Sequence, residues 1–189
     1  MRGNSCEDND HSFETILDGT NLYGWKMCGK GEFVVVANKM IISKGGMGLL
    51  WYTKKKFLNF ILKVDWKTSQ RADNSGVFVR FAYPDDDPWI AVNTGYEIQI
   101  YDAEPPDGNA THRTGAIYDF APPLTSASRE PGQWNTFQIQ VIHQNYAVIL
   151  NNKRVTEFTG NRQLEGYIGL QNHDSKSRVS FGKIAIKEL

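Results

Sequence analysis

The chain has 189 residues, of which 40% are hydrophobic and 12% are aromatic. This composition is typical of a folded domain and excludes a disordered chain. Lys and Arg together number 21, as do Asp and Glu, so the chain lacks the basic surplus of most nucleic-acid-binding proteins. Its apolar stretches are much shorter than the roughly 20 residues that a transmembrane helix needs. We therefore expect no nucleic-acid partner and no membrane-spanning helix.

The first twelve residues are polar, and we predict a disordered tail over 1–12 and a single folded domain over 13–189. Cys6 is followed by an acidic run at 7–10. Two interpretations of this cysteine stay open. It is either the lipid-modified start of a mature bacterial lipoprotein or a stray cysteine in an ordinary tail. The first interpretation would place the protein in the periplasm or at the cell surface, attached to the membrane only through that lipid.

Runs of β-branched and aromatic residues, bounded by Gly, Asn, Asp and Pro, predict strands along the rest of the chain. In chain order the predicted strands are 32–37, 39–43, 48–52, 60–68, 76–81, 96–101, 136–143, 146–150, 154–158, 167–171 and 178–187.

Long loops are predicted at 82–94, 103–113 and 121–133, and no apolar pattern of helical period is sustained. Strands without intervening helices favour an all-β, antiparallel β-sandwich or jelly roll with under about 10% helix.

Alternation along the strands assigns each residue to one face of a sheet. In the strand 96–101, Ile98 and Ile100 share the core face, and Glu97, Gln99 and Tyr101 share the opposite face.

The same rule applied to 76–81 and 167–173 turns Arg80, Gln171 and His173 outward and Phe81 inward. If these strands are neighbours, one polar surface results, with His112 on a loop that could reach it. Planar polar groups beside aromatic rings are what a sugar-binding groove needs, although an ordinary solvated face is the alternative.

The order Glu97, Gln99, Asp102 resembles the E-x-D-x-x-E strand of laminarinase-type β-glucanases. In those enzymes a bulge brings the last acid to the same face as the first. The outer pair of carboxyl groups then acts as nucleophile and acid/base. This chain departs from that pattern, because the middle acid is an amide and the last acid is the shorter Asp. A classical glycoside hydrolase that uses Glu97 and Asp102 is therefore one alternative.

Seven motifs occur in a fixed order and together extend over most of the chain. They are LDGTNLYGW at 17–25, GLLW at 48–51 with FILKVDW at 60–66, NSGVFVR at 74–80, GYEIQIYD at 95–102, TGAIY at 114–118, GQWN at 132–135 and GYIGLQNH at 166–173. With these motifs the chain resembles the 3-keto-disaccharide hydrolase domain family. One departure from the family's pattern is Asp174, where the family usually has Gly.

The resemblance implies a concanavalin A-like jelly roll in an exported bacterial protein of carbohydrate catabolism. It also implies cleavage of glycosides that are oxidised at C3, because the ketone acidifies the proton at C2 and allows β-elimination. Together with the polar surface, it predicts a carbohydrate substrate and catalytic roles for Glu97, His173 and Arg80. Substrate-binding roles are predicted for Trp66, Asn74, Gln99, Tyr101, Asp102, Tyr118 and Gln171.

In this scheme Glu97 or His173 is the base, and Arg80 stabilises the enolate oxygen. No cofactor is required, although a divalent metal ion could replace or assist Arg80. A non-catalytic, lectin-like sugar-binding module remains the main alternative to an enzyme.

Overall fold

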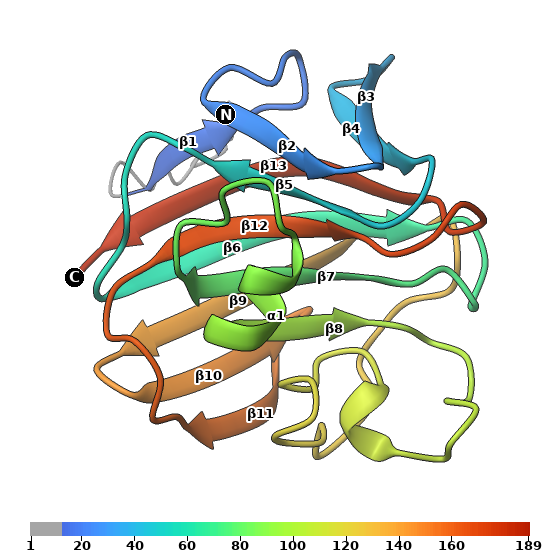
Figure 1. Cartoon of the computed structure of the whole chain (residues 1–189). Helices are drawn as coiled ribbons and strands as arrows, with labels where there is room; N and C mark the ends of the chain where they lie inside the picture. Colours follow the sequence, from blue (N-terminus) through green and yellow to red (C-terminus); the bar gives the residue numbers. More distant parts are fainter. Residues whose placement is uncertain (1–12) are drawn as a thin grey trace, which may run out of the picture.

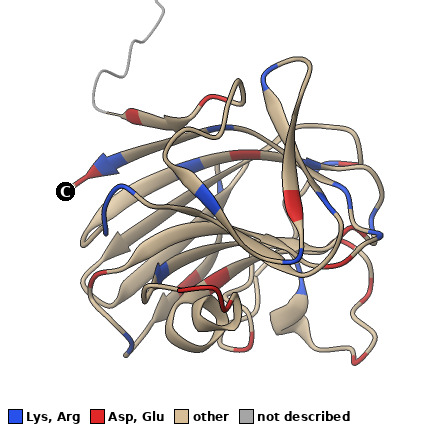
Figure 2. Ribbon diagram, turned by 45° about the horizontal axis from the view of Figure 1, so that its top comes forward, with Lys and Arg blue, Asp and Glu red and all other residues tan. Residues whose placement is uncertain are grey.

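The computed structural model describes residues 13–189, so the predicted tail and the expectation for Cys6 lie outside the described residues. None of the helices in this part of the chain is long and apolar enough to cross a membrane. The charged side chains are distributed over loops and strands, and neither sign forms a continuous stripe in the view of Figure 2.

The described residues form two antiparallel sheets with one short α-helix and one short 3₁₀-helix, which confirms the predicted β-sandwich (Figure 1). The elements are β1 (Glu14–Leu17), β2 (Trp25–Gly29), β3 (Glu32–Val36), β4 (Met40–Lys44), β5 (Gly48–Tyr52), β6 (Phe60–Thr68), β7 (Ser75–Phe81), α1 (Trp89–Thr94), β8 (Tyr96–Ile100), η1 (Ala110–His112), β9 (Asn135–Ile142), β10 (Asn145–Leu150), β11 (Lys153–Thr159), β12 (Tyr167–Asn172) and β13 (Val179–Glu188).

The larger sheet has eight strands in the order β11-β10-β9-β6-β13-β4-β3, with β1 also paired to β13. The smaller sheet has five strands in the order β2-β5-β12-β7-β8. Strands β12, β7 and β8 are therefore neighbours, as the predicted polar surface requires.

The core lies between the two sheets and follows the period-2 pattern of the strands. Along β6 every second residue is buried, and these residues include Leu62, Val64 and Trp66. The Trp66 ring packs against Phe137 with ring centroids 5.2 Å apart. The predicted substrate-binding role of Trp66 is therefore wrong, because its side chain faces the interior from the larger sheet.

A second apolar cluster covers part of the outer face of the smaller sheet. It contains Trp51, Phe78, Phe81 and Ala91. Ala91 belongs to α1, which lies over β7 and β8 (Figure 1). The segment 82–94 was predicted as a loop without a helix, and this is wrong. A helix of six residues is too short to show a helical period, but it buries Ala91 against the sheet.

Strand β7 contains a bulge at Arg80. Arg80 has a φ of 56°, in the left-handed region. In the pairing with β12, Phe81 lies opposite Tyr167 and Val79 lies opposite Ile168, so Arg80 has no partner of its own. The extra residue reverses the alternation, which turns Arg80 inward and Phe81 outward. Both residues were predicted on the opposite face.

The Arg80 side chain is fully buried between the sheets. Its guanidinium donates to the carbonyl oxygens of Leu58 and His143 and, at 3.3 Å, to the hydroxyl of Tyr146. It also lies over the Tyr146 ring, 5.5 Å from its centroid. Arg80 therefore joins the backbone at Leu58 and His143 to the core, and the prediction that it lies on the polar surface is wrong.

Candidate functional site

A cavity of about 440 Å³ opens on the outer face of the smaller sheet, and we call it the central hollow. It is lined by Met47, Ala72, Asn74, Trp89, Val92, Glu97, Gln99, Tyr101, Pro105, Pro106, His112, Tyr118, Gln171, His173 and Asp174. Seven of the ten predicted site residues line it: Asn74, Glu97, Gln99, Tyr101, Tyr118, Gln171 and His173.

Two amide side chains stand on either side of a glycine across the floor of the central hollow. Gly76 of β7 pairs with Gln99 of β8. On its other side, the next residue Val77 pairs with Leu170 of β12, so Gly76 lies beside Gln171. Gln99, Gly76 and Gln171 therefore form a row across three strands that are about 4.8 Å apart. Because the glycine has no side chain, the floor of the hollow is open between the two amides.

Glu97 is the buried acid of the central hollow, with a side chain from β8 and an exposure of 6%. Burial raises the pKa of its carboxyl group from 4.5 to about 8, and the nearby charge of Asp119 contributes in the same direction. A carboxyl group with such a pKa can exchange its proton near neutral pH.

The glycine at position 76 makes the space that Glu97 occupies. A Cβ atom built on Gly76 would lie 2.0 Å from Glu97 Oε1 and 2.6 Å from Glu97 Cγ. Any larger residue at this position would therefore displace the carboxyl group, which explains why a glycine stands near the start of a buried strand.

Amide groups surround the carboxyl group. In the orientation in which the Gln99 nitrogen faces Glu97, it donates to Glu97 Oε1 at 3.3 Å and to the Ser75 carbonyl oxygen at 3.1 Å. Gln171 has an exposure of 6%, and its Oε1 atom has no hydrogen-bond partner within residues 13–189. A buried acceptor without a partner, beside a cavity, is available to a hydroxyl group of a ligand.

His173 is held by the residue that follows it. Its Nδ1 atom lies 2.8 Å from Asp174 Oδ2, which leaves Nε2 as the nitrogen for a ligand. Burial raises the pKa of Asp174, but hydrogen bonds from His173, Ser177 and the Lys176 backbone outweigh it and hold that pKa well below its usual range. Ser177 Oγ also accepts from the Asn74 backbone N–H at 2.9 Å, which ties this turn to the start of β7.

His112 lies in the wall of the central hollow, whereas the sequence placed it only on a nearby loop. Its Nδ1 atom lies 3.1 Å from Asp107 Oδ2, and its Nε2 atom lies 2.7 Å from Asp119 Oδ1. The ring stacks on Tyr118 at 4.4 Å between centroids and 10° between planes. His112 therefore holds Tyr118 and Asp119 in place beside Glu97. The motif TGAIY gave no sign that these three residues are in contact.

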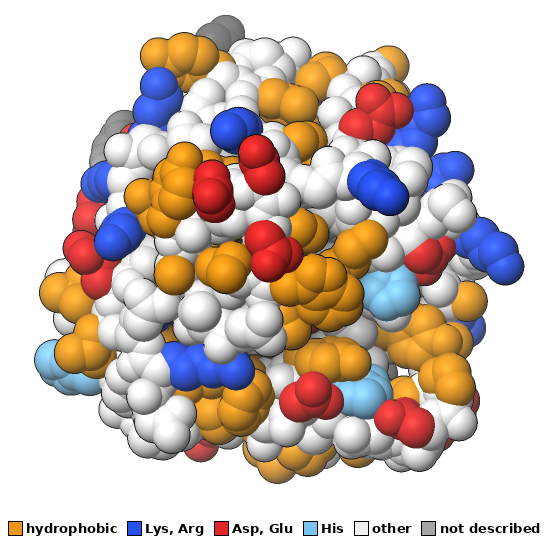
Figure 3. Space-filling model, in the orientation of Figure 1, with side chains coloured by type: hydrophobic (Ala, Val, Ile, Leu, Met, Phe, Trp, Pro, Cys, Tyr) orange, Lys and Arg blue, Asp and Glu red, His pale blue; other side chains and the backbone are white. Residues whose placement is uncertain are grey.

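The remaining walls are apolar and come from the helix α1 and from a loop. Trp89 and Val92 of α1 and Pro105 and Pro106 of the following loop line the hollow, and Trp89 is 55% exposed. The face shown in Figure 3 has a depression bordered by apolar and histidine side chains with acidic side chains close by. Trp89 was missed because its role depends on the unpredicted helix α1.

Asp102 does not join Glu97 in the central hollow. The β7–β8 register runs regularly from Ser75↔Ile100 to Val79↔Tyr96, and Asp102 lies beyond the end of β8. Asp102 accepts a hydrogen bond from Ser128 at 2.7 Å.

Asp102 lines another cavity of about 320 Å³, which we call the second hollow. Its lining residues are Tyr101, Asp102, Ala103, Glu104, Ala110, Arg113, Thr114, Pro123, Leu124, Thr125 and Ser126. The substrate-binding role predicted for Asp102 in the groove of Glu97 is therefore wrong.

Within residues 13–189, no group of three or more His, Cys, Asp and Glu side chains is arranged to hold a metal ion. Asp107 and Asp119 both contact His112, but they face different nitrogens of its ring and so do not share one metal position.

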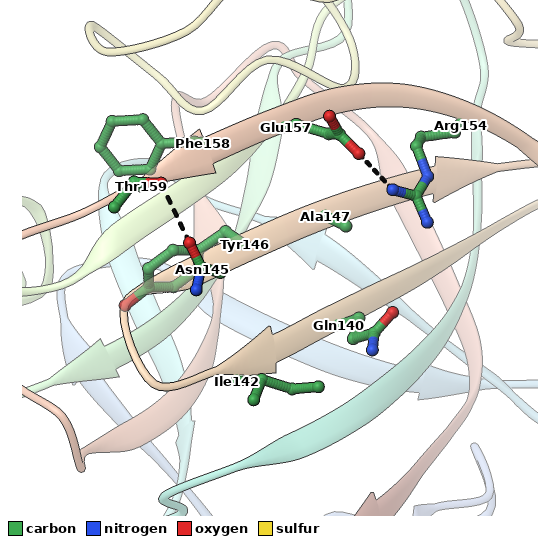
Figure 4. A pocket seen from close by; sticks show the side chains of 9 residues that line it. All are labelled: Gln140, Ile142, Asn145, Tyr146, Ala147, Arg154, Glu157, Phe158 and Thr159. Carbon is green, nitrogen blue, oxygen red and sulfur yellow. Dashed lines mark hydrogen bonds and ion pairs between the residues drawn. The ribbon is translucent and has the colours of Figure 1, made fainter.

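A further hollow of about 380 Å³ lies on the larger sheet, over β9, β10 and β11 (Figure 4). Its polar side chains are paired with one another, as in Arg154 with Glu157 and Thr159 with Asn145. Its carboxyl group, that of Glu157, is exposed and ion-paired, so the candidate chemistry lies in the central hollow, where the buried carboxyl group of Glu97 is found.

Solved structures with similar folds are associated with carbohydrates. A candidate glycosyl hydrolase from Parabacteroides distasonis matches with a TM-score of 0.80 and 22% identity, over 99% of this chain and 98% of that chain. A second from the same organism has a TM-score of 0.69 and 25% identity, over 87% and 99%. The carbohydrate binding module CBM66 from Bacillus subtilis has a TM-score of 0.64 and 12% identity, over 87% and 96%.

No curated protein sequence matches this chain. The family model of the 3-keto-alpha-glucoside-1,2-lyase-like domain matches residues 12–187, which is nearly the whole chain. This match agrees with the resemblance seen in the seven motifs and supports a carbohydrate-related function. The chain belongs to the 3-keto-alpha-glucoside-1,2-lyase-like domain family.

Proposed function

We propose that the protein cleaves glycosides whose sugar carries a ketone at C3, by removing the C2 proton and eliminating the C1 substituent. The observation that carries this proposal is Glu97, a buried acid with a pKa raised to about 8 in a hollow lined by amides. A ketone acidifies the neighbouring C–H bond, so one strong base and donors for the developing oxygen charge suffice.

In the first step Glu97 takes the C2 proton, and the electrons of the C2–H bond form a C2=C3 double bond with a negative oxygen at C3. In the second step that oxygen reforms the ketone, a C1=C2 double bond forms, and the C1–O bond breaks. The leaving oxygen takes up a proton, either the one that Glu97 removed or one from water, and the first course returns Glu97 to its ionised form. Addition of water to the double bond would complete a net hydrolysis.

The negative oxygen needs donors, and His173 is the group we assign to it. Asp174 Oδ2 lies against His173 Nδ1, so Nε2 is the ring nitrogen that faces the hollow, and it donates to the oxygen whenever it carries a proton. The amide groups of Gln99, Gln171 and Asn74 are available to sugar hydroxyls. This assignment replaces Arg80, which lies between the sheets.

A classical glycoside hydrolase needs a second carboxyl group about 5–10 Å from the first, across the glycosidic bond. Asp102 lines the second hollow and is bonded to Ser128, so it does not support that mechanism.

The test is to incubate the protein with a 3-keto-α-glucoside and, separately, with its unoxidised parent, and to follow release of the aglycone. We expect release from the oxidised substrate alone. Release from the parent would indicate a classical glycoside hydrolase. Binding of both without release from either would indicate a sugar-binding module and would refute the proposal.

A further inference from the structure

Glu97 lies in a wall that two cavities share. Val92, Glu97 and Tyr118 line both the central hollow and a smaller cavity of about 170 Å³, which we call the side pocket. Val92 belongs to α1, which packs over β7 and β8 (Figure 1). The side pocket therefore borders the buried acid on a different side from the hollow that we assign to the sugar.

The side pocket reaches the surface of the protein and is small. Asn93, Asp119 and Phe120 line it and are exposed, so its mouth lies between α1 and the residues that follow Tyr118. Its volume is below that of a usual small-molecule site, which is about 300 Å³ or more. Because a water molecule takes about 30 Å³ of the liquid, the side pocket suits a few water molecules and not a sugar.

The charged groups of the side pocket are held in place. Arg162 donates to two backbone carbonyl oxygens at the end of α1, so its guanidinium is already engaged. His112 Nε2 lies 2.7 Å from Asp119 Oδ1, which leaves Asp119 Oδ2 for water at the mouth. A negative group at the mouth attracts a proton, and water between Asp119 and Glu97 can carry one.

A sugar in the central hollow would close the other way from Glu97 to solvent. Glu97 is only 6% exposed, and a sugar whose C2 proton faces it covers the side that borders the central hollow. A proton taken from C2 then has three destinations. It can return to C2, pass to the leaving oxygen, or pass to water in the side pocket.

We propose that the side pocket is the route by which Glu97 exchanges its proton with solvent while a sugar occupies the central hollow. The O–H bond of the Glu97 carboxyl group breaks, water in the side pocket takes the proton, and the electron pair stays on the carboxylate. The proton passes to bulk water beside Asp119, and the leaving oxygen takes one proton from water, so the balance of protons is kept. The inference rests on the proposed function in one respect, that Glu97 is the base at C2.

The test uses a ligand that can lose its C2 proton but has nothing to eliminate. The 3-keto derivative of 1,5-anhydroglucitol has no substituent at C1, so its enolate can only take a proton back at C2. In D₂O, deuterium enters C2 only if the proton on Glu97 exchanges with solvent before it returns. The rate of this exchange is followed by NMR, with a sample without protein as the blank.

The variants fill the side pocket and leave the central hollow unchanged. Asn93 is exposed and lines the side pocket alone, so Asn93→Phe and the larger Asn93→Trp would narrow it. Gln163→Phe is the matched control, because Gln163 is an exposed amide beside Arg162 in the chain and lines none of the hollows described above. Thermal unfolding gives the folded fraction of each variant, and both rates are expressed per folded protein.

For each variant, the exchange rate is compared with kcat for cleavage of a 3-keto-α-glucoside. We expect Asn93→Phe to lower the exchange rate about tenfold and Asn93→Trp to lower it further. Cleavage should fall less than about threefold, because the leaving oxygen can take the proton of Glu97 directly. Gln163→Phe should change neither rate. Unchanged exchange in both Asn93 variants, or equal losses of exchange and cleavage, would overturn the route.

The native protein separates this inference from the proposed function. If it exchanges the C2 proton, loses that exchange in the Asn93 variants and cleaves nothing, the proposed function fails and the route stands. If it cleaves the 3-keto-α-glucoside but exchanges no C2 proton in the anhydro ligand, the route fails alone. If it does neither, Glu97 is not the base at C2 and both fail.

Discussion

At the scale of single residues, the site depends on Glu97, a carboxyl group whose burial disfavours its charged form. Burial raises the pKa of Glu97 to about 8, and the neighbouring Asp119 acts in the same direction. The space for this group exists only because Gly76 has no side chain. A base of high pKa removes a weakly acidic C–H proton better than an ordinary carboxylate does, which is the use that we propose for this burial.

The Glu97→Gln variant keeps the size of the side chain and removes its basicity. We expect kcat on a 3-keto-glycoside to fall by about 10²–10⁴-fold, with little change in KM. In the native protein kcat should rise with pH between pH 6 and about pH 8, as the base becomes ionised. Steady-state kinetics from pH 5 to pH 10 checks both points. A kcat that does not rise between pH 6 and pH 8 would show that Glu97 is not the base.

The same shift predicts how stability depends on pH. Between the ordinary pKa of 4.5 and about 8, the folded protein holds a proton on Glu97 that the unfolded chain releases. The free energy of unfolding should therefore lose up to about 1.4 kcal/mol per pH unit across this window. Denaturant unfolding at pH 5 and pH 8 should show that Glu97→Gln becomes progressively more stable than the native protein. Equal pH dependence of the two proteins would show that Glu97 titrates normally.

Asp174 tests the role of His173 without removing it. Asp174→Asn keeps the oxygen that accepts from the Lys176 and Ser177 backbone, but it places a nitrogen against His173 Nδ1. We expect kcat to fall about tenfold, with the pH profile altered. Ser177→Ala is the control, since it removes the hydroxyl bonds to Asp174 and to the Asn74 backbone and leaves the His173 pair. A loss of stability without a change in the pH profile would mean that Asp174 only shapes the turn.

At the scale of elements, the bulge in β7 decides which residues reach the site. The left-handed conformation of Arg80 turns its side chain into the core and brings Phe81 to the outer cluster under α1. The helix then carries Trp89 to the rim of the central hollow. One extra residue in a strand therefore removes an arginine from the site and helps to build an apolar wall.

The Arg80→Met variant separates structure from catalysis. It leaves the partly buried carbonyl oxygens of Leu58 and His143 without their donor. We expect the free energy of unfolding to fall by about 3 kcal/mol, because both acceptors lose a charged donor. The folded fraction should keep its kcat. If the variant had normal stability in urea but had lost turnover, Arg80 would have a direct role in catalysis and the structural role assigned here would be wrong.

Alternation along the strands predicted the site where the strands are regular. It turned Glu97, Gln99 and Gln171 to one surface because β8 and β12 follow the period of two. It failed at Arg80 because a left-handed residue is not visible in a hydrophobic pattern. It could not reveal the clamp of His112 by Asp107 and Asp119, since these residues meet through loop geometry. Trp66 was assigned from a motif, although its inward parity on β6 marked it as a core residue.

At the scale of the whole molecule, the candidate site lies on the smaller sheet, and the larger sheet supports it from the other side of the core. The core between them provides a rigid base, and the outer face of the smaller sheet is divided between an apolar cluster and the central hollow. Loops and α1 form the walls, as is usual for sites placed at the edge of a rigid scaffold. The relatives in fold include candidate hydrolases and a binding module, so the site chemistry and not the fold decides the function.

The central claim is that Glu97 removes the proton at C2, and the most direct measurement uses a 3-keto-α-glucoside that carries deuterium at C2. We predict that the native protein cleaves it more slowly than the protium form and releases the deuterium to solvent, and that Glu97→Gln cleaves neither form at a comparable rate. Equal rates for the two forms, with the deuterium retained in the sugar product, would contradict the account.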